Sequence, residues 1–360
     1  MKLFIFSIVC AFLQVSQQNP KSHWTLLPHI LVAEVDGTLG QLPLSCWAQE
    51  EELKRRSNNS QDIFWKKNGE EEAQRGNSFL VKLEESLGGG NYTCHSKDGS
   101  LLNHTVVLIQ EDETKRRKIL VKNDEGDYLR CSAQNFNGKF SCSWTWHSSR
   151  VGKVAFVKAR RTSDDSVTHC SVDASGRHWT CSAGQSNLVC SVDDVGFRIS
   201  CVDKQHCPYA EESQQIHITI YVRTQHFLVE NYSLRFFLSE IVKPDKVRIS
   251  KVNTTMIEWS YPSSWSSPFS YFPLSFQIAL LKGRCTRCDS PCTDSKSTKT
   301  LTVHSPNICQ FEVKHNTRAV CVRAQDAFCN SQWSEWSHFR LRRGKKNKKN
   351  KKNQRLQNGE

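Results

Sequence analysis

No apolar run in the 360-residue sequence reaches the roughly 20 residues that a membrane-spanning helix needs. The longest apolar segment, Leu3–Leu13, follows Lys2 and precedes the small and polar residues Val15, Ser16 and Gln17. This order of a positive residue, a short apolar stretch and small residues is typical of a signal peptide. We therefore expect residues 1–17 to be a signal peptide and the mature chain to be secreted, with no membrane insertion.

Catalytic signatures are missing as well. No Ser/His/Asp arrangement or phosphate-binding loop stands out, and the 13 His are scattered. The chain is therefore expected not to be an enzyme, with no catalytic residue and no cofactor. Cys285, Cys288 and Cys292 are close enough in sequence to bind zinc. Because a nearby fourth ligand is lacking and exported chains meet an oxidising compartment, disulfides are favoured and no metal site is expected.

The net charge of +13 is placed in a way that argues against nucleic acid as a partner. Residues 340–360 hold ten Lys or Arg and one Glu, which is +9 of the total. Residues 344–360 therefore form a basic tail, expected to be disordered because it carries like charges and no apolar core. Heparan-type glycans are its expected partners, and a merely solubilising tail is the alternative. The glycan-binding candidates are Lys345, Lys346, Lys348, Lys349, Lys351 and Lys352.

Cysteines and glycosylation sequons agree with export. The chain has 16 Cys, and Cys10 leaves with the signal peptide, so an odd number remains and at least one lacks an internal partner. Five N-x-S/T sequons predict N-glycosylation. They lie at Asn58, Asn91, Asn103, Asn231 and Asn253.

Residues 18–112 carry the pattern of an immunoglobulin-like domain. In such domains a Cys on each sheet forms the inter-sheet disulfide, a Trp packs on it, and a Tyr two residues before the second Cys ties down a corner. Cys46, Trp65, Tyr92 and Cys94 stand in these positions. The segment is therefore predicted to be a β-sandwich with Cys46 and Cys94 as disulfide partners.

Short strand-like segments with turn signals between them continue through residues 117–242 and 243–343, with a break at Lys243-Pro244-Asp245. Expected strands include 216–222, 233–238, 256–259, 276–280 and 319–323. Cys131 and Cys142 flank the turn signal Asn137-Gly138, so they are expected to form a disulfide across a hairpin. The fold class is all-β. Cys142-Ser143-Trp144 resembles the first fibronectin type III module of class I cytokine receptors, and the strands after the break predict a second such domain.

A WSxWS box lies near the end of the second of these domains, at Trp333, Ser334, Glu335, Trp336 and Ser337. Two Trp three residues apart leave gaps that a guanidinium group can enter. Arg323 upstream and Arg340 or Arg342 downstream are the available cations. The box resembles that of class I cytokine receptors, and its expected role is to stiffen the domain.

Longer stretches resemble the interleukin-12 beta-subunit family. They include Trp259-Ser260-Tyr261-Pro262, the segments 265–272 and 207–213, Glu230-Asn231-Tyr232-Ser233, and 322–326. The resemblance implies a secreted beta subunit of the kind that interleukin-12 and interleukin-23 share. Such a subunit binds a four-helix cytokine alpha subunit at the bend between domains two and three, and engages a cell-surface cytokine receptor. A soluble class I receptor chain that presents or sequesters a cytokine is the alternative.

The resemblance also implies roles for three residues. Cys207 matches the family's interchain disulfide position, and counting cysteines by domain places the spare one in domain two if bridges stay within domains. Asp326 is expected to hold an Arg of the alpha subunit, with Phe328 adding apolar contact. The sequence departs from the family at Ala327-Phe328-Cys329, where the family usually shows Tyr, and in its dense third-domain cysteines and basic tail.

Overall fold

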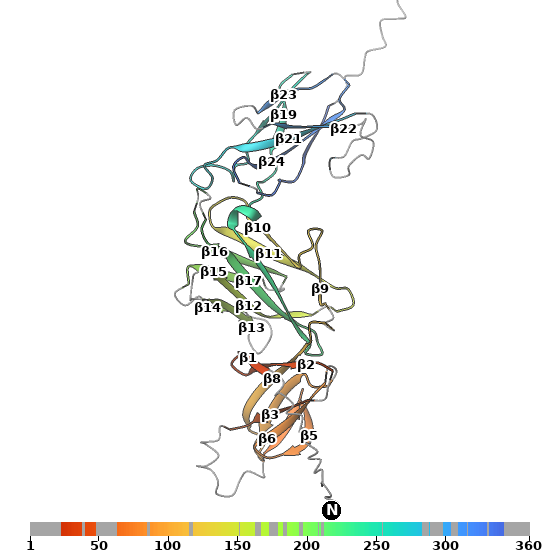
Figure 1. Ribbon diagram of the computed structural model, residues 1–360, viewed down its shortest axis with the longest axis vertical. Coiled ribbons are helices and arrows are strands. Elements are labelled where there is room, and N and C mark those ends of the chain that lie inside the picture. Colours follow the sequence, from red (N-terminus) through yellow and green to blue (C-terminus); the bar gives the residue numbers. More distant parts are fainter. Residues whose placement is uncertain are drawn as a thin grey trace, which may run out of the picture. The chain divides into compact units, whose positions relative to one another are not determined.

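The structure is a computed structural model of the chain, and it places its strands in three successive pairs of sheets (Figure 1). The residues that it describes form two compact units. The first holds those up to Val121 with Trp146–Ala155 and Tyr221–Asn231, and the second holds the others. The described residues are 23–37, 40–47, 63–84, 87–114, 118–150, 152–162, 167–172, 179–182, 186–193, 197–207, 209, 212–253, 255–282, 288, 298–303, 309–314, 316–329 and 331–341.

The first pair of sheets forms the first sandwich. Its six-stranded sheet has the order β1 (His23–Leu27), β2 (Ile30–Val35), β8 (Leu101–Glu111), β7 (Gly90–His95), β4 (Phe64–Lys67), β5 (Glu70–Arg75). The facing sheet pairs β3 (Gly40–Ser45) with β6 (Ser78–Leu83). Burial alternates along β6, where Phe79, Val81 and Leu83 point inward. This period of two is that of a strand with one face on a core.

Cys46 and Cys94 form a disulfide in the core of the first sandwich, with Cα atoms 6.0 Å apart, and Trp65 belongs to the same buried cluster. The hydroxyl of Tyr92 donates a hydrogen bond of 3.3 Å to the carbonyl oxygen of Gly88. Burial raises the pKa of Tyr92, which keeps this donor protonated. A Cβ at Gly88 would lie 2.8 Å from the Lys82 carbonyl oxygen, so the corner depends on a glycine here.

The second sandwich consists of two five-stranded sheets. One has the order β10 (Leu129–Ser132), β11 (Lys139–Trp146), β16 (Arg198–Asp203), β15 (Leu188–Val192), with β9 (Leu120–Val121) also on β11. The other has the order β14 (Trp179–Ser182), β13 (Thr168–Val172), β12 (Lys153–Arg161), β17 (Ile216–Arg223), β18 (Val229–Phe236).

Three disulfides join neighbouring antiparallel strands of the second sandwich, and each spans 11 positions of sequence. Their cysteines stand directly opposite one another in the strand register, with Cα atoms 4.0 to 4.1 Å apart. Such close pairs are where side chains meet across an antiparallel ladder. The pairs are Cys131–Cys142, Cys170–Cys181 and Cys190–Cys201.

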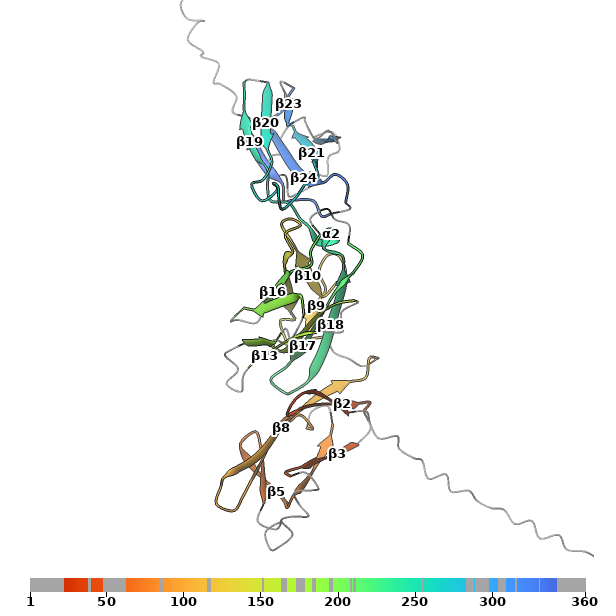
Figure 2. The same ribbon diagram turned by 90° about the vertical axis from the view of Figure 1, so that its left-hand side faces the viewer.

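The third sandwich has a sheet of β19 (Arg248–Lys251), β20 (Met256–Ser260) and β23 (Gln310–Glu312). Its second sheet has the order β22 (Thr298–Val303), β21 (Leu274–Leu281), β24 (Ala319–Asp326), β25 (Ser337–Arg340). The expected strand 233–238 is wrong at its end, because β18 stops at Phe236 and Leu238 begins the helix α2 (Leu238–Ile241) (Figure 2). Glu240 accepts a hydrogen bond from the Phe237 backbone N–H and fixes that helix start.

The fold class of one immunoglobulin-like and two fibronectin type III sandwiches is thus confirmed. The domain limits predicted from the sequence stay predictions. Among the described residues, no helix has the length and apolarity that crossing a membrane requires.

Candidate functional site

The second and third sandwiches meet within the second unit in a set of loops that we call the elbow. Backbone hydrogen bonds run from Ala133 N–H to the Ile241 carbonyl oxygen (2.9 Å) and from Gln332 N–H to that of Val242 (2.8 Å). The Asn135 amide donates to the Ser264 carbonyl oxygen over 2.7 Å. The elbow comprises the described residues 133–136, 207, 209, 212, 238–246, 261–273, 326–329, 331 and 332.

The WSxWS box lies directly beside the elbow. The Arg323 guanidinium carbon lies 4.9 Å from the ring centroid of Trp333 and 4.5 Å from that of Trp336. Arg323 comes from β24, and its Nε also donates a hydrogen bond of 2.7 Å to Gln277. The guanidinium is therefore stacked on both indoles, and burial lowers its pKa without removing its charge at neutral pH.

Both serines of the box bind backbone. Ser334 accepts a hydrogen bond from the Ala324 N–H at its hydroxyl (2.9 Å) and donates its own N–H to the Ala324 carbonyl oxygen (2.7 Å), while Ser337 donates to the Val247 carbonyl oxygen. Glu335, between the two Trp, forms an ion pair with Lys243 of the elbow. The box therefore holds β24 and connects the third sandwich to the elbow.

Two pairs of aromatic side chains lie in the elbow, and we call the four rings together the aromatic row. The rings of Tyr209 and Tyr271 stack with centroids 4.8 Å apart. Phe272, next in the chain, packs on Phe328 with centroids 5.3 Å apart. Tyr209 and Tyr271 are exposed, and Phe328 is 72% exposed. Exposed aromatic rings grouped in this way mark a surface for contact with another protein.

Asp326, at the end of β24, lies two residues before Phe328 of the aromatic row and is only 3% exposed. Its Oδ1 accepts hydrogen bonds from the backbone N–H groups of Phe328 (2.7 Å) and Cys329 (3.0 Å). Its Oδ2 is buried and accepts no hydrogen bond from any residue that the structure describes. Burial raises the pKa of Asp326, although the two N–H groups oppose this. A buried carboxylate with a vacant acceptor is suited to a cationic partner.

Three described cysteines carry free thiols: Cys207, Cys309 and Cys329. Of the three residues that the resemblance assigned to partner binding, Asp326 and Phe328 are joined by a hydrogen bond. Cys207 lies two residues before Tyr209, whose ring stacks on Tyr271 of the same elbow. Counting cysteines by domain assumed that Cys309 and Cys329 were bridged, and in the structure they are not. Cys288 is joined to Cys321, which removes its thiolate from any zinc site, and Cys285 and Cys292 lie outside the described residues.

Sequence reasoning missed part of this surface. Tyr209, Tyr271 and Phe272 were noticed only as parts of resembling stretches. The sequence could have pointed to them, because each is an aromatic residue in a loop. An aromatic residue in a loop is not accounted for by the alternation of a strand that faces a core, and binding residues are often found on loops.

Four of the five predicted sequons lie among the described residues. Asn91, Asn231 and Asn253 are exposed. Asn103 is partly buried, and its amide donates a hydrogen bond of 3.1 Å to the Cys46 carbonyl oxygen. Asn58 and the six lysines of the predicted tail lie outside the described residues.

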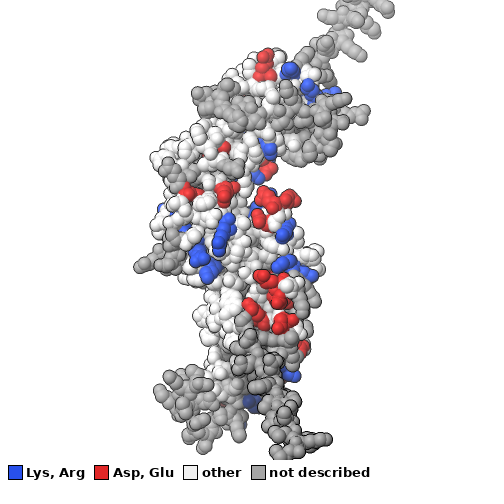
Figure 3. Space-filling view, viewed as in Figure 1, with Lys and Arg blue, Asp and Glu red and all other residues white. Residues whose placement is uncertain are grey.

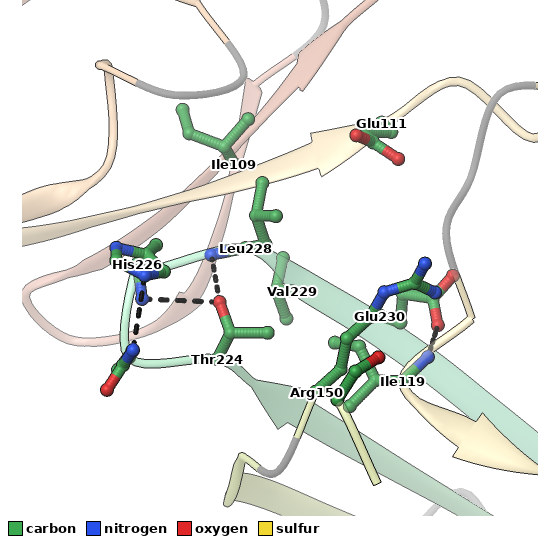
Figure 4. Close-up of a pocket in the computed structure, with 11 residues that line it drawn as sticks. Ile109, Glu111, Ile119, Arg150, Thr224, His226, Leu228, Val229 and Glu230 are labelled. Atoms are coloured by element: carbon green, nitrogen blue, oxygen red, sulfur yellow. Dashed lines mark hydrogen bonds between the residues drawn. The ribbon is translucent and has the colours of Figure 1, made fainter. Parts of the chain in front are cut away.

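A cavity of about 290 Å³ lies in the first unit, and Figure 4 shows its lining. Ile109, Leu228 and Val229 provide apolar wall, and Glu230 lies at one side. The Glu230 carboxylate accepts the Ile119 backbone N–H over 2.9 Å, so it fixes the chain in place. No residue predicted from the sequence as a site lines this cavity, and we assign it no ligand.

Charges on the described surface do not form one basic area on the face that Figure 3 presents, where acidic and basic side chains lie in small alternating groups. This agrees with the placement of most of the net charge in residues 340–360. The elbow, with its exposed aromatic rings and its buried carboxylate, remains the candidate site for a protein partner.

An immunoglobulin-like sandwich, two fibronectin type III sandwiches and a WSxWS box whose Arg323 stacks between two Trp define a protein of the class I cytokine-receptor type. The family described as cytokine interleukin-12p40 C-terminus matches residues 126–224. The chain is 30% identical over 331 residues to interleukin-12 subunit beta of Sigmodon hispidus, which covers 87% of this chain and 91% of that protein. The chain belongs to the interleukin-12 beta-subunit family.

Two further relatives of the same name have a similar sequence identity to this chain. That of Equus caballus is 31% identical over 334 residues, covering 87% of this chain and 91% of the relative. That of Homo sapiens is 30% identical over 273 residues, covering 72% and 76%. The predicted family membership is thus confirmed, and the chain is a cytokine subunit, which is not a class of enzyme.

Proposed function

We propose that the chain is the secreted beta subunit of a heterodimeric cytokine of the interleukin-12 and interleukin-23 type. Its elbow binds a four-helix alpha subunit, and the heterodimer engages a cell-surface cytokine receptor in immune signalling. The observation that carries the proposal is the Asp326 carboxylate, which is 3% exposed and whose Oδ2 accepts no hydrogen bond within the described chain. Buried polar atoms normally have partners, and a donor from the alpha subunit would supply one for this atom.

The aromatic row supports the same surface. Phe328 is the most exposed large apolar side chain of the described residues and lies two positions from Asp326. An exposed ring beside a desolvated charge is the usual composition of an interface hot spot, with an apolar contact that keeps water from the ion pair. A guanidinium of the alpha subunit would donate to Oδ2, and Phe328 would cover it.

Cys207 is proposed as the covalent link to the alpha subunit. Its thiol is free, and it lies two residues before Tyr209 of the aromatic row. To test the link, Cys207→Ser is introduced into a Cys329→Ser background and the secreted heterodimer is run without reductant. Loss of the covalent band supports the assignment, and a band of unchanged intensity contradicts it. Cys309→Ser, outside the elbow, is the matched control.

The ionic contact is tested separately from the covalent one. With Cys207 and Cys329 both replaced by Ser, Asp326→Ala should weaken association with the alpha subunit by about 2–5 kcal/mol, the usual cost of removing one member of a desolvated charge pair. Lys251→Ala, on the exposed β19 strand, serves as a control for general loss of charge. Undiminished affinity of the Asp326→Ala variant contradicts the proposed contact.

We also propose that the predicted basic tail, residues 344–360, holds the secreted protein near heparan-type glycans. Six lysines within eight residues would displace counterions from a sulfated chain, so binding should depend strongly on salt. N-glycosylation is proposed at Asn91, Asn231 and Asn253 on the basis of their exposure.

A further inference from the structure

Two free thiols belong to residues that are close in sequence to the aromatic row. Cys207 is two residues before Tyr209, whose ring stacks on Tyr271. Phe272 packs on Phe328, and Cys329 follows Phe328 directly in the chain. A partner that covers the aromatic row therefore contacts the loops that carry both thiols.

The backbone of Cys329 is also hydrogen-bonded to the buried carboxylate of Asp326. Its backbone N–H donates to Oδ1 of Asp326 over 3.0 Å, while Oδ2 of the same group has no hydrogen-bond donor among the described residues. The acceptor that a partner's cation would occupy therefore belongs to the same loop as the thiol. This vacant, 3% exposed carboxylate is an observation independent of the cysteine itself.

We propose that Cys329 is a second covalent attachment site for the four-helix partner and that it reacts only after that partner has docked on Asp326. The inference rests on the proposed function. It adds a residue that departs from the family pattern, since the family usually shows Tyr in this stretch.

The thiol is held unreactive in the free chain by its surroundings. Burial, followed by the negative charges of Asp326 and Glu212, raises the pKa of Cys329 to about 11. The thiolate is the nucleophile in disulfide chemistry, so only a very small fraction of Cys329 can react at neutral pH. A partner cation on Asp326 cancels one of these charges, and the thiolate fraction increases tenfold for each unit by which the pKa falls.

The reaction is an oxidation of two thiols. The Cys329 thiol and a thiol of the partner together lose two protons and two electrons and form one S–S bond. The acceptor is a disulfide-bearing oxidoreductase of the secretory compartment, whose own disulfide is reduced to two thiols. Exchange proceeds through a mixed disulfide, with the thiolate attacking one sulfur and the other sulfur leaving.

The control of Cys329 reactivity by the neighbouring negative charges is tested on the free chain, with two small disulfides as probes. Cystamine carries two ammonium groups and dithiodiglycolate carries two carboxylates, so the Asp326 and Glu212 charges should make Cys329 react at least threefold faster with cystamine, by attraction of opposite charge. Asp326→Asn keeps the Oδ1 acceptor and removes the charge, and it should reduce this preference and speed alkylation by N-ethylmaleimide. If wild-type Cys329 reacts with both probes at equal rates, its reactivity is not controlled by these charges and the inference is overturned.

The attachment is tested on the heterodimer secreted by cells that naturally produce the chain, collected into N-ethylmaleimide and mapped as non-reduced peptides. The expected result is a Cys329 peptide joined to a helical polypeptide, with a covalent heterodimer that persists in Cys207→Ser and is lost in Cys207→Ser/Cys329→Ser.

Cys329 recovered as its N-ethylmaleimide adduct in a Cys207-linked heterodimer overturns the inference alone. Cys329 joined to glutathione or to a second copy of this chain overturns it too. Absence of any helical partner, covalent or not, contradicts the proposed function itself.

Discussion

The backbone N–H of Cys329 donates a hydrogen bond of 3.0 Å to Oδ1 of Asp326. This contact ties a free thiol to a carboxylate that is buried without a counter-ion among the described residues. Burial of an unpaired carboxylate is costly to a folded chain, which agrees with the proposal that Asp326 binds a cation of the partner. The free beta subunit should therefore be less stable than the same fold with this charge removed.

Asp326→Asn should stabilise the free chain at pH 7, by on the order of 1 kcal/mol, because the amide is less costly to bury than the carboxylate. The pKa of Asp326 is raised in the folded state, so the folded chain holds its proton more strongly than the unfolded chain. The contribution of Asp326 to the stability of the wild type is therefore most favourable below the ordinary aspartate pKa, about 3.9, and is lost as pH rises through the folded-state pKa. In thermal unfolding, Asp326→Asn should be more stable than the wild type at pH 7, and the difference should vanish near pH 3.5. A variant less stable than wild type at pH 7 contradicts this account.

Arg323→Ala should destabilise the third sandwich by about 2 kcal/mol, since it removes two cation–π contacts from a partly buried guanidinium. Arg323→Lys should recover only part of this, because an ammonium cannot stack on both indoles as a planar guanidinium does. Arg340→Ala, an exposed position on the neighbouring strand β25, is the control and should have little effect. Chemical denaturation followed by Trp fluorescence measures all three. Equal stability of the Arg323→Ala and Arg340→Ala variants would argue against the stacking.

Asn103 should carry less glycan than the exposed sequons. Its amide is partly buried and donates to the Cys46 carbonyl oxygen over 3.1 Å, whereas Asn91, Asn231 and Asn253 are exposed. A glycan on Asn103 therefore competes with a hydrogen bond next to the core disulfide. Peptide mass spectrometry of the secreted protein, before and after enzymatic release of N-glycans, gives the occupancy at each site. Full occupancy at Asn103 contradicts the expectation.

Truncation after Arg343 should lower the salt concentration at which the protein leaves a heparin column, because it removes the lysines of the predicted tail. Thermal unfolding and assembly with the alpha subunit should stay unchanged. A variant in which the same lysines are replaced by Gln controls for tail length. Elution of full-length and truncated proteins at one salt concentration would show that the tail is only a solvated end.

The sequence was most informative where a local pattern carries the chemistry. The spacing of Cys46, Trp65, Tyr92 and Cys94 predicted a core that the structure places in one cluster. The fold class followed from short strands with turn signals between them. These features depend on residues that are close in sequence or on the characteristic spacing of a known domain type. Both can be recognised in a single sequence.

Contacts between distant segments were not accessible in this way. Cys288 and Cys321 are 33 positions apart, and their bridge depends on where β24 lies in its sheet. The Tyr209–Tyr271 stack likewise depends on two loops of different sandwiches. The pairs Cys170–Cys181 and Cys190–Cys201 repeat the 11-residue spacing of Cys131–Cys142, so that signal was present and was not used.

The central claim is that this chain functions as one half of a covalent cytokine heterodimer. Its most direct test is purification of the secreted protein from its natural source under non-reducing conditions, with identification of every polypeptide in the preparation by mass spectrometry. The account predicts a constant second polypeptide of four-helix type, linked by a disulfide to Cys207. A free monomer that binds a helical cytokine reversibly, with no interchain disulfide, would contradict it and would indicate a soluble receptor chain.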